Sequence, residues 1–149
     1  MSLRQPDDLA TALTVSLALL ALVSGPVDAA ESASLLPDGI VTHEDGRLRI
    51  KELFESYLEL RARGWELDVI ADSEPAGAEY ALPIIALRTP HDGAAVWILA
   101  GIHGEEPAGP NAIAAAIDDL AALGETRAVV LLPLLNPHGY ARNWRYLNT

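Results

Sequence analysis

The sequence predicts an α/β fold in which a mixed, mostly buried β-sheet is flanked by helices. Two nearly continuous apolar runs, residues 94–102 and 127–135, are typical of strands buried on both faces in the middle of such a sheet. The alanine-rich segment between them, residues 111–123, has the composition and spacing of a helix that ends at Gly124. Strand, helix and strand in immediate succession predict a βαβ unit with a right-handed crossover.

Three further elements are expected before this unit. Residues 48–63 carry apolar side chains at three- and four-residue spacing and stop at Gly64, which predicts a helix. Residues 65–71 and 80–88 predict two strands separated by a turn-rich segment. Pro83 lies within the second strand and lacks an N–H, so we expect an edge position or a bulge there.

Length and composition limit the classes of function. The chain has 149 residues, which suits one domain, and its 50% hydrophobic content excludes a disordered chain. A formal net charge of −11 argues against a nucleic-acid partner. The absence of cysteine excludes disulfides, thiolate-bound metals and a thiol nucleophile. Any metal site must therefore use histidine and carboxylate ligands.

The N-terminal region predicts export. Residues 9–23 form an uncharged apolar run, too short for the roughly 20 residues of a spanning helix but suited to a signal peptide. We expect residues 1–29 to be a signal peptide, the protein to be secreted or periplasmic, and no stable membrane span. The alternative is an amphipathic N-terminal helix or a mis-set start site, with a cytoplasmic protein. Residues 30–47 are small and polar, which indicates a linker or exposed lead-in containing a solvated His43.

A candidate metal-binding pair follows the first apolar run. His103 and Glu106 lie in the segment Gly-Ile-His-Gly-Glu-Glu-Pro, at the carboxyl end of a strand, where α/β sheets bind ligands. Imidazole and carboxylate at this spacing suit Zn²⁺, which uses three protein ligands and an open position in catalytic sites. The pair alone is a weak signal, since a capping carboxylate beside a loop histidine gives the same pattern. Glu105 is the alternative carboxylate and is assigned an outer role.

A candidate oxyanion-binding region follows the second apolar run. Residues 126–149 contain three arginines and no acid, although the chain as a whole is acidic. Arg142 and Arg145 follow the segment Asn-Pro-His-Gly, and a guanidinium near a metal can polarise a carbonyl group. The alternative is that both arginines cap the sheet or pair with surface acids. His91 lies in a predicted turn, and we expect it to be a loop residue.

Together these motifs resemble the N-terminal half of the zinc carboxypeptidase (carboxypeptidase A-like) superfamily. Its relatives include murein-peptide amidases and the aspartoacylase/succinylglutamate desuccinylase deacylases. The resemblance covers residues 48–149 and implies that His103 and Glu106 bind zinc. It also implies that Arg145 polarises the scissile carbonyl, with Arg142 as the fallback in substrate binding. His138 is expected to be a variant of the turn and not a ligand.

The resemblance implies a zinc-dependent, metallocarboxypeptidase-like hydrolase of peptide or amide bonds. It places the third zinc ligand and the general base beyond Thr149, so we expect the chain to represent about half of the catalytic domain and to be inactive alone. The alternatives are a zinc-dependent deacylase or amidase of the aspartoacylase type, and a non-catalytic binding remnant of the fold. A peptide or amide substrate is the expected partner.

The signal-peptide hypothesis predicts the N-terminus of exported protein. Cleavage after the Val27-Asp28-Ala29 pattern leaves a chain that begins at Ala30, or within one or two residues of it. N-terminal sequencing of protein from the cell envelope or medium measures this directly. Met1 or Ser2 on the exported material would contradict the hypothesis.

Overall fold

The computed structural model describes residues 35–37, 40, 43–75 and 77–146, so the predicted signal peptide lies outside the described residues. No helix within this part of the chain is long and apolar enough to cross a membrane. The elements in order are α3 (Ile50–Ala62), β1 (Glu66–Ser73), β2 (Leu82–Arg88), β3 (Val96–Leu99), α4 (Ala108–Ala115), α5 (Ile117–Gly124), β4 (Val129–Leu132) and α6 (Pro137–Arg142).

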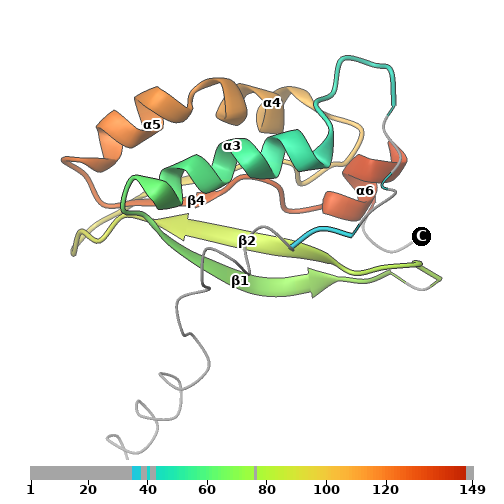
Figure 1. Ribbon diagram of the computed structural model, residues 1–149, viewed down its shortest axis with the longest axis horizontal. Helices are drawn as coiled ribbons and strands as arrows, with labels where there is room; N and C mark the ends of the chain where they lie inside the picture. Colours follow the sequence, from blue (N-terminus) through green and yellow to red (C-terminus); the bar gives the residue numbers. More distant parts are fainter. Residues whose placement is uncertain (1–34, 38–39, 41–42, 76, 147–149) are drawn as a thin grey trace, which may run out of the picture.

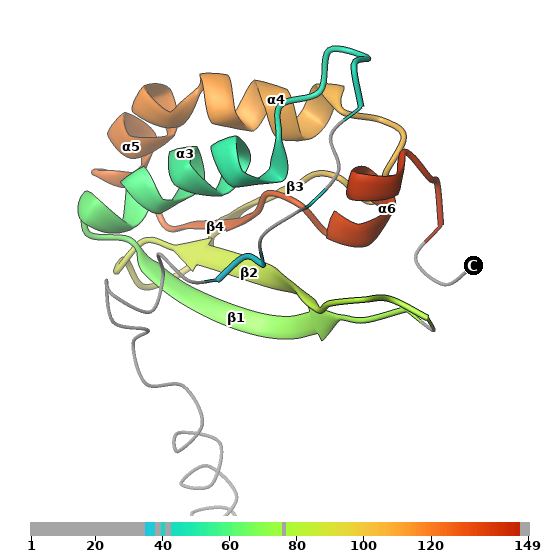
Figure 2. The same ribbon diagram turned by 45° about the vertical axis from the view of Figure 1, so that its right-hand side comes forward.

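The predicted α/β class is confirmed, because the strands form a mixed sheet flanked by helices. The strand order is β1-β2-β4-β3, with antiparallel pairing of β1 to β2 and β2 to β4, and parallel pairing of β3 to β4. Helices α3, α4 and α5 lie side by side on one face of this sheet, and α6 lies near the beginning of α3 (Figure 1, Figure 2).

The predicted βαβ unit is present, but its connection is two helices and not one. β3 and β4 pair in parallel from Val96 opposite Val129 to Leu99 opposite Leu132. The helical segment starts at Ala108, before the expected residue 111, and is interrupted at Ala116. The Ala116 N–H lies near two carbonyl oxygens, at 3.0 and 3.1 Å, which marks a tightened turn between α4 and α5.

The core lies between the helices and the sheet. Helix α3 buries one apolar face, as its three- and four-residue spacing predicts. The buried side chains of this face belong to one core cluster with those of β2 and β4. The fully buried members of this core are Leu53, Tyr57, Leu60, Leu82, Ile85, Leu87, Val129, Leu131, Leu134 and Tyr140. Removing these side chains from water stabilises the layer on which both candidate motifs are mounted.

The prediction that residues 94–102 form a strand buried on both faces is wrong. β3 spans four residues at the edge of the described sheet, and Val96, Trp97 and Leu99 are 47%, 63% and 50% exposed. The second run behaves as predicted, since β4 lies between β2 and β3 and is mostly buried. An apolar run therefore located both strands correctly, but it did not distinguish the central strand from the edge strand.

Pro83 occupies a place that is consistent with its missing N–H. In strand order β2 is internal, yet it pairs with β4 only through Leu87 and Arg88 at one end. Pro83 lies at the other end of β2 and pairs with Asp72 of β1. It therefore occupies a stretch of β2 with strand pairing on one side within the described residues, where proline is tolerated.

The exposed edge of β3 predicts self-association of the isolated chain. An apolar edge strand offers both unpaired main-chain groups and apolar area to a second molecule, and a lysine in such a strand opposes this contact. We expect Trp97→Lys to increase the monomer fraction at a given concentration, measured by sedimentation velocity over a concentration series. Trp144→Lys, which removes an exposed tryptophan outside the sheet, is the matched control. A wild-type chain that stays monomeric at every concentration would contradict this prediction.

Candidate functional site

The two predicted motifs lie side by side at one end of the sheet, beyond the carboxyl ends of β3 and β4. Because β3 and β4 are parallel neighbours, the segments that follow them leave the sheet at the same end. The pairing continues past both strands: the Leu135 N–H donates to the Ala100 carbonyl at 3.0 Å, and the Asn136 N–H donates to the Gly101 carbonyl at 2.8 Å. The backbone thus fixes the register between the two motifs.

Glycine is required where the segments touch. A Cβ atom on Gly104 would overlap the backbone of Gly139 and the carbonyl oxygen of Trp144, and a Cβ on Gly139 would overlap Asn136. Gly101 has a φ of 64°, a conformation that favours glycine. The segment after β3 can therefore turn sharply and lie directly on the backbone of α6.

A short helix that the sequence analysis did not predict supports the second motif. Asn136 caps α6 by accepting a hydrogen bond from the Gly139 N–H at 2.8 Å, and Pro137 occupies the first turn. Asn143 ends the helix in the left-handed conformation, with a φ of 51°. The sequence Asn-Pro is a helix-start signal, but α6 is six residues long and has no apolar periodicity to support that signal.

His103, Glu106 and Arg145 converge at this end of the sheet. The Nδ1 atom of His103 lies 3.3 Å from both carboxylate oxygens of Glu106. The Arg145 guanidinium contacts His103 Nε2 at 3.2 Å and Glu106 Oε1 at 3.2 Å. An arginine can only donate, so in this arrangement Nε2 accepts and the Nδ1–H of the neutral ring donates to Glu106.

Glu105 completes the cluster from the same loop. Its Oε1 atom accepts a hydrogen bond from Arg145 at 2.7 Å, whereas its Oε2 atom is buried and has no partner among the described residues. Burial favours the protonated form, but the hydrogen bond and charge of Arg145 hold the pKa of Glu105 below its ordinary value. The same hydrogen bond raises the pKa of Arg145. Glu105 and Arg145 therefore form a charged pair at the site.

The donor set suits two positions of a zinc shell. His103 and Glu106 offer one nitrogen and carboxylate oxygens at a place where a cationic group already lies, and this is the chemistry that zinc accepts. Within the described residues, no group of three or more histidine, cysteine or acidic side chains is arranged to hold a metal ion. The pair thus fits a zinc ion in part, and a catalytic site needs one further protein ligand.

The other predicted residues lie apart from this cluster. Arg142 is exposed in the last turn of α6, and it is Arg145 whose contacts reach His103 and Glu106. His138 is buried in α6 and stacks on Tyr80 with ring centroids 5.4 Å apart, and desolvation lowers its pKa. His91 lies in its predicted loop and donates to the Gly124 carbonyl at 2.9 Å. His43, expected to be solvated, is half-buried and donates to the Ala141 carbonyl at 3.1 Å.

Arg47 is a buried charged residue beside the site that the sequence did not single out. It lies at the end of the expected lead-in, and its side chain is 1% exposed. Asp45 accepts hydrogen bonds from Nε of Arg47 at 2.8 Å and from Nη2 of Arg47 at 2.6 Å. These bonds lower the pKa of Asp45 to about 2. Nothing in the local sequence distinguishes Arg47, because it follows a polar, turn-prone segment.

Known proteins resemble this chain in the region that carries the site. Residues 92–149 match the family described as the succinylglutamate desuccinylase/aspartoacylase catalytic domain. Carboxypeptidase 2 of Trichophyton tonsurans and of Trichophyton equinum is 41% identical over 61 residues, which covers 36% of this chain and 11% of each relative.

Solved structures give the same result. Proteins of Shewanella baltica and Shewanella denitrificans, provisionally described as metallopeptidases, are 26% identical, with TM-scores of 0.53 and 0.54. The matches cover 65% of this chain and 36% and 37% of theirs, so the chain spans little more than a third of these solved proteins. The predicted resemblance to the zinc carboxypeptidase-like superfamily is confirmed.

The Asp45–Arg47 pair predicts a pH dependence of stability. The pKa of Asp45 is lowered in the folded chain from 3.8 to about 2, so the ionised form favours folding. This contribution is fully present above the unfolded pKa and is lost as the pH falls from about 4 to about 2. We expect wild type to exceed Asp45→Asn in free energy of unfolding at neutral pH, with the difference shrinking below pH ~4.

Urea unfolding of both chains between pH 2 and pH 7 measures this difference. Glu44→Gln, which removes the neighbouring exposed acid, is the matched control for the loss of one negative charge. A difference between wild type and Asp45→Asn that stays constant over the whole range would contradict the assigned pairing.

Proposed function

Taking the similarity to the zinc carboxypeptidase-like superfamily as the premise, we propose that this chain forms part of a zinc-dependent hydrolase of peptide or amide bonds. His103 and Glu106 would hold the metal, and Arg145 would bind the carbonyl oxygen of the substrate. The observation that carries the proposal is the convergence of these three side chains, from two motifs far apart in sequence, at the carboxyl ends of β3 and β4.

The resident cofactor of this proposal is zinc. When bound, a zinc ion lowers the pKa of its bound water toward neutrality and polarises carbonyl oxygens. The ligand pair supports zinc because zinc accepts nitrogen and carboxylate oxygen ligands. The side chains of His103 and Glu106 already converge on one cationic group, the guanidinium of Arg145. A third ligand from outside the described residues is part of the proposal.

Arg145 would change partners when the metal binds. The guanidinium donates to Nε2 of His103, and Nδ1 is engaged by Glu106, so a metal on either ring nitrogen displaces one of these contacts. Glu105 keeps Arg145 close, because their hydrogen bond at 2.7 Å does not involve the ligand atoms. The free N–H groups of Arg145 can then donate to an oxygen that becomes negative as a substrate carbonyl is attacked.

A second candidate function is deacylation of the aspartoacylase type. The match of residues 92–149 to the succinylglutamate desuccinylase/aspartoacylase domain favours it, whereas the relatives named carboxypeptidase favour peptide cleavage. Both reactions hydrolyse an amide bond and use the same residues of this chain. Assays of a protein that contains this chain together with the rest of the catalytic domain, using N-acylated amino acids and peptides that have a free carboxyl terminus, separate the two.

The proposal predicts how metal affinity depends on the ligand pair. We expect the 149-residue chain to bind zinc weakly through two ligands and His103→Ala to lower the affinity by at least about tenfold. Glu106→Gln should cost less, because the amide still presents an oxygen but no charge. Competition with a chromophoric chelator measures these affinities, and His91→Ala, a loop histidine bonded to the Gly124 carbonyl, is the matched control.

Two outcomes would contradict this assignment. Wild-type affinity in His103→Ala would show that another group binds the metal. Equal losses in His91→Ala and His103→Ala would show nonspecific binding to histidine, which favours the remnant without a functioning metal site.

A further inference from the structure

We propose that Arg47 is a positioning residue that fixes the His103–Glu106 pair relative to Arg145. The importance of this positioning for catalysis rests on the proposed function. The positioning itself is inferred from the contacts of the buried Arg47 side chain. Arg47 contacts neither the candidate ligands nor Arg145 directly. It acts through two main-chain carbonyls and one side chain of the two segments that carry them, residues 102–107 and residues 139–145; these are called the two loops, although the second includes the end of α6.

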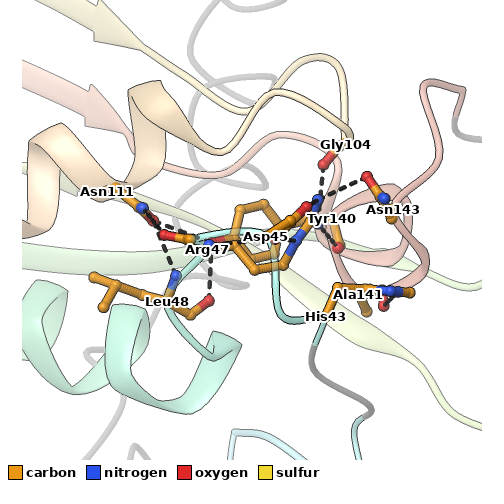
Figure 3. Close-up of polar contacts among 10 residues, drawn as sticks. His43, Asp45, Arg47, Leu48, Gly104, Asn111, Tyr140, Ala141 and Asn143 are labelled. Carbon is orange, nitrogen blue, oxygen red and sulfur yellow. Dashed lines mark hydrogen bonds and ion pairs between the residues drawn. The ribbon is translucent and has the colours of Figure 1, made fainter.

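The guanidinium of Arg47 joins both site loops. Its Nη1 donates to the Gly104 carbonyl at 3.3 Å and to the Tyr140 carbonyl, and its Nη2 donates to Asn143 Oδ1 at 2.7 Å (Figure 3). Gly104 directly follows His103, and Asn143 precedes Arg145 by two residues. One planar group therefore spans the two loops at the point where their backbones touch.

The buried charge of Arg47 is compensated locally. Asp45 forms the ion pair described above, with Nη2 and Oδ2 2.6 Å apart, and the Tyr140 ring lies 4.8 Å from the guanidinium carbon. A buried charge without such partners strongly destabilises a fold. With these partners, Arg47 can donate to the main chain in a place that water does not reach.

The segment that carries Arg47 is itself anchored. Asn111 of α4 donates to the Gly46 carbonyl at 2.8 Å and accepts from the Leu48 N–H at 3.2 Å. The Tyr140 hydroxyl donates to the Leu48 carbonyl at 2.8 Å (Figure 3). Residues on both sides of Arg47 are therefore tied to α4 and α6, and the guanidinium is held in place from outside the two loops.

Arginine is specifically suited to this position. Its planar fork carries five donors, and four different acceptor groups surround it: Asp45, Gly104, Tyr140 and Asn143. A lysine could keep the charge and the contact to Asp45, but its single ammonium on a flexible chain cannot span the same acceptors. The charge and the bridging function of Arg47 can therefore be separated by substitution.

This bridging matters because displacements of about 1 Å in a catalytic arrangement can cost about 100-fold in rate. The candidate ligands are partly exposed and belong to a loop that contains two glycines, so their own packing holds them weakly. The fixed reference is Arg47, which is buried and bonded on every side. Loss of its fork should leave the sheet intact and loosen both loops together.

The experiment uses the full 149-residue chain with Arg47→Met, Arg47→Lys and Asn143→Gly, and Arg49→Met as the control. Arg49 is an exposed arginine two residues away that pairs with Glu52. Asn143→Gly removes one acceptor of the fork and keeps the left-handed backbone, so it tests the bridge if Arg47→Met does not fold. The readouts are urea unfolding, hydrogen exchange of the metal-free chain, and zinc affinity by chelator competition.

In Arg47→Lys we expect a free energy of unfolding between those of Arg47→Met and wild type, because the charge stays paired with Asp45 while other buried acceptors lose their donor. We also expect faster exchange in residues 102–107 and 139–145, and zinc affinity at least about tenfold lower. Asn143→Gly should shift exchange and affinity in the same direction by less, and Arg49→Met should shift neither. If Arg47→Lys is more stable than Arg47→Met but regains neither exchange protection nor zinc affinity, the role of Arg47 is positioning and not merely structural.

The outcomes distinguish the two proposals. Wild-type exchange in both Arg47→Lys and Asn143→Gly overturns the positioning role, whatever the zinc result. Faster exchange confined to the two loops of the variants supports the positioning role even if the wild-type chain binds no zinc. Absence of zinc binding by wild type would instead contradict the zinc binding that the proposed function assigns to His103 and Glu106. Faster exchange spread equally over α3 and the sheet shows a merely structural role and overturns the inference.

Discussion

The parallel pairing of β3 with β4 is the constraint on which the rest of the site depends. It continues as main-chain hydrogen bonds from residues 100 and 101 to residues 135 and 136, beyond the last paired residue of each strand. Every side chain of the candidate site follows one of these two points. The convergence of the two motifs therefore comes from backbone geometry, and the side chains need only short loops to meet.

The two loops are then held together by different physical means. Contact between Gly104 and the backbone at Gly139 excludes side chains from the junction, so steric fit sets the closest approach. Arg47 supplies directional hydrogen bonds at the same junction, and Glu105 holds Arg145 by charge. The buried layer beneath them, made by α3, β2 and β4, contributes stability but no chemistry. Tyr140 belongs to both groups, because it is a core residue whose carbonyl accepts from Arg47.

The sequence predicted the parts of this architecture that depend on local pattern. Apolar runs located β3 and β4, and the strand-helix-strand pattern predicted the unit in which they pair in parallel. The choice of His103, Glu106 and Arg145 came from their position after these runs and from the family resemblance. The sequence could not predict that β3 lies at an edge, because burial on both faces depends on which other strands are present. The break at Ala116 depends on helix packing over the sheet, in a segment whose composition favours a continuous helix. Arg47 was missed because the acceptors that join it to the site, the Gly104 and Tyr140 carbonyls and Asn143 Oδ1, lie 57 or more residues away in the chain and leave no trace in the local sequence.

The contact of Arg145 with both candidate ligands has a consequence for the order of assembly. Arg145 contacts His103 and Glu106 and pairs with Glu105, so one internal cation compensates part of the negative charge of the two carboxylates. If the proposed zinc ion binds, it would compete with Arg145 for His103 and Glu106 and would not fill an uncompensated anionic site. On the proposed function, the fold would then form around Arg145 first, and metal binding would follow folding.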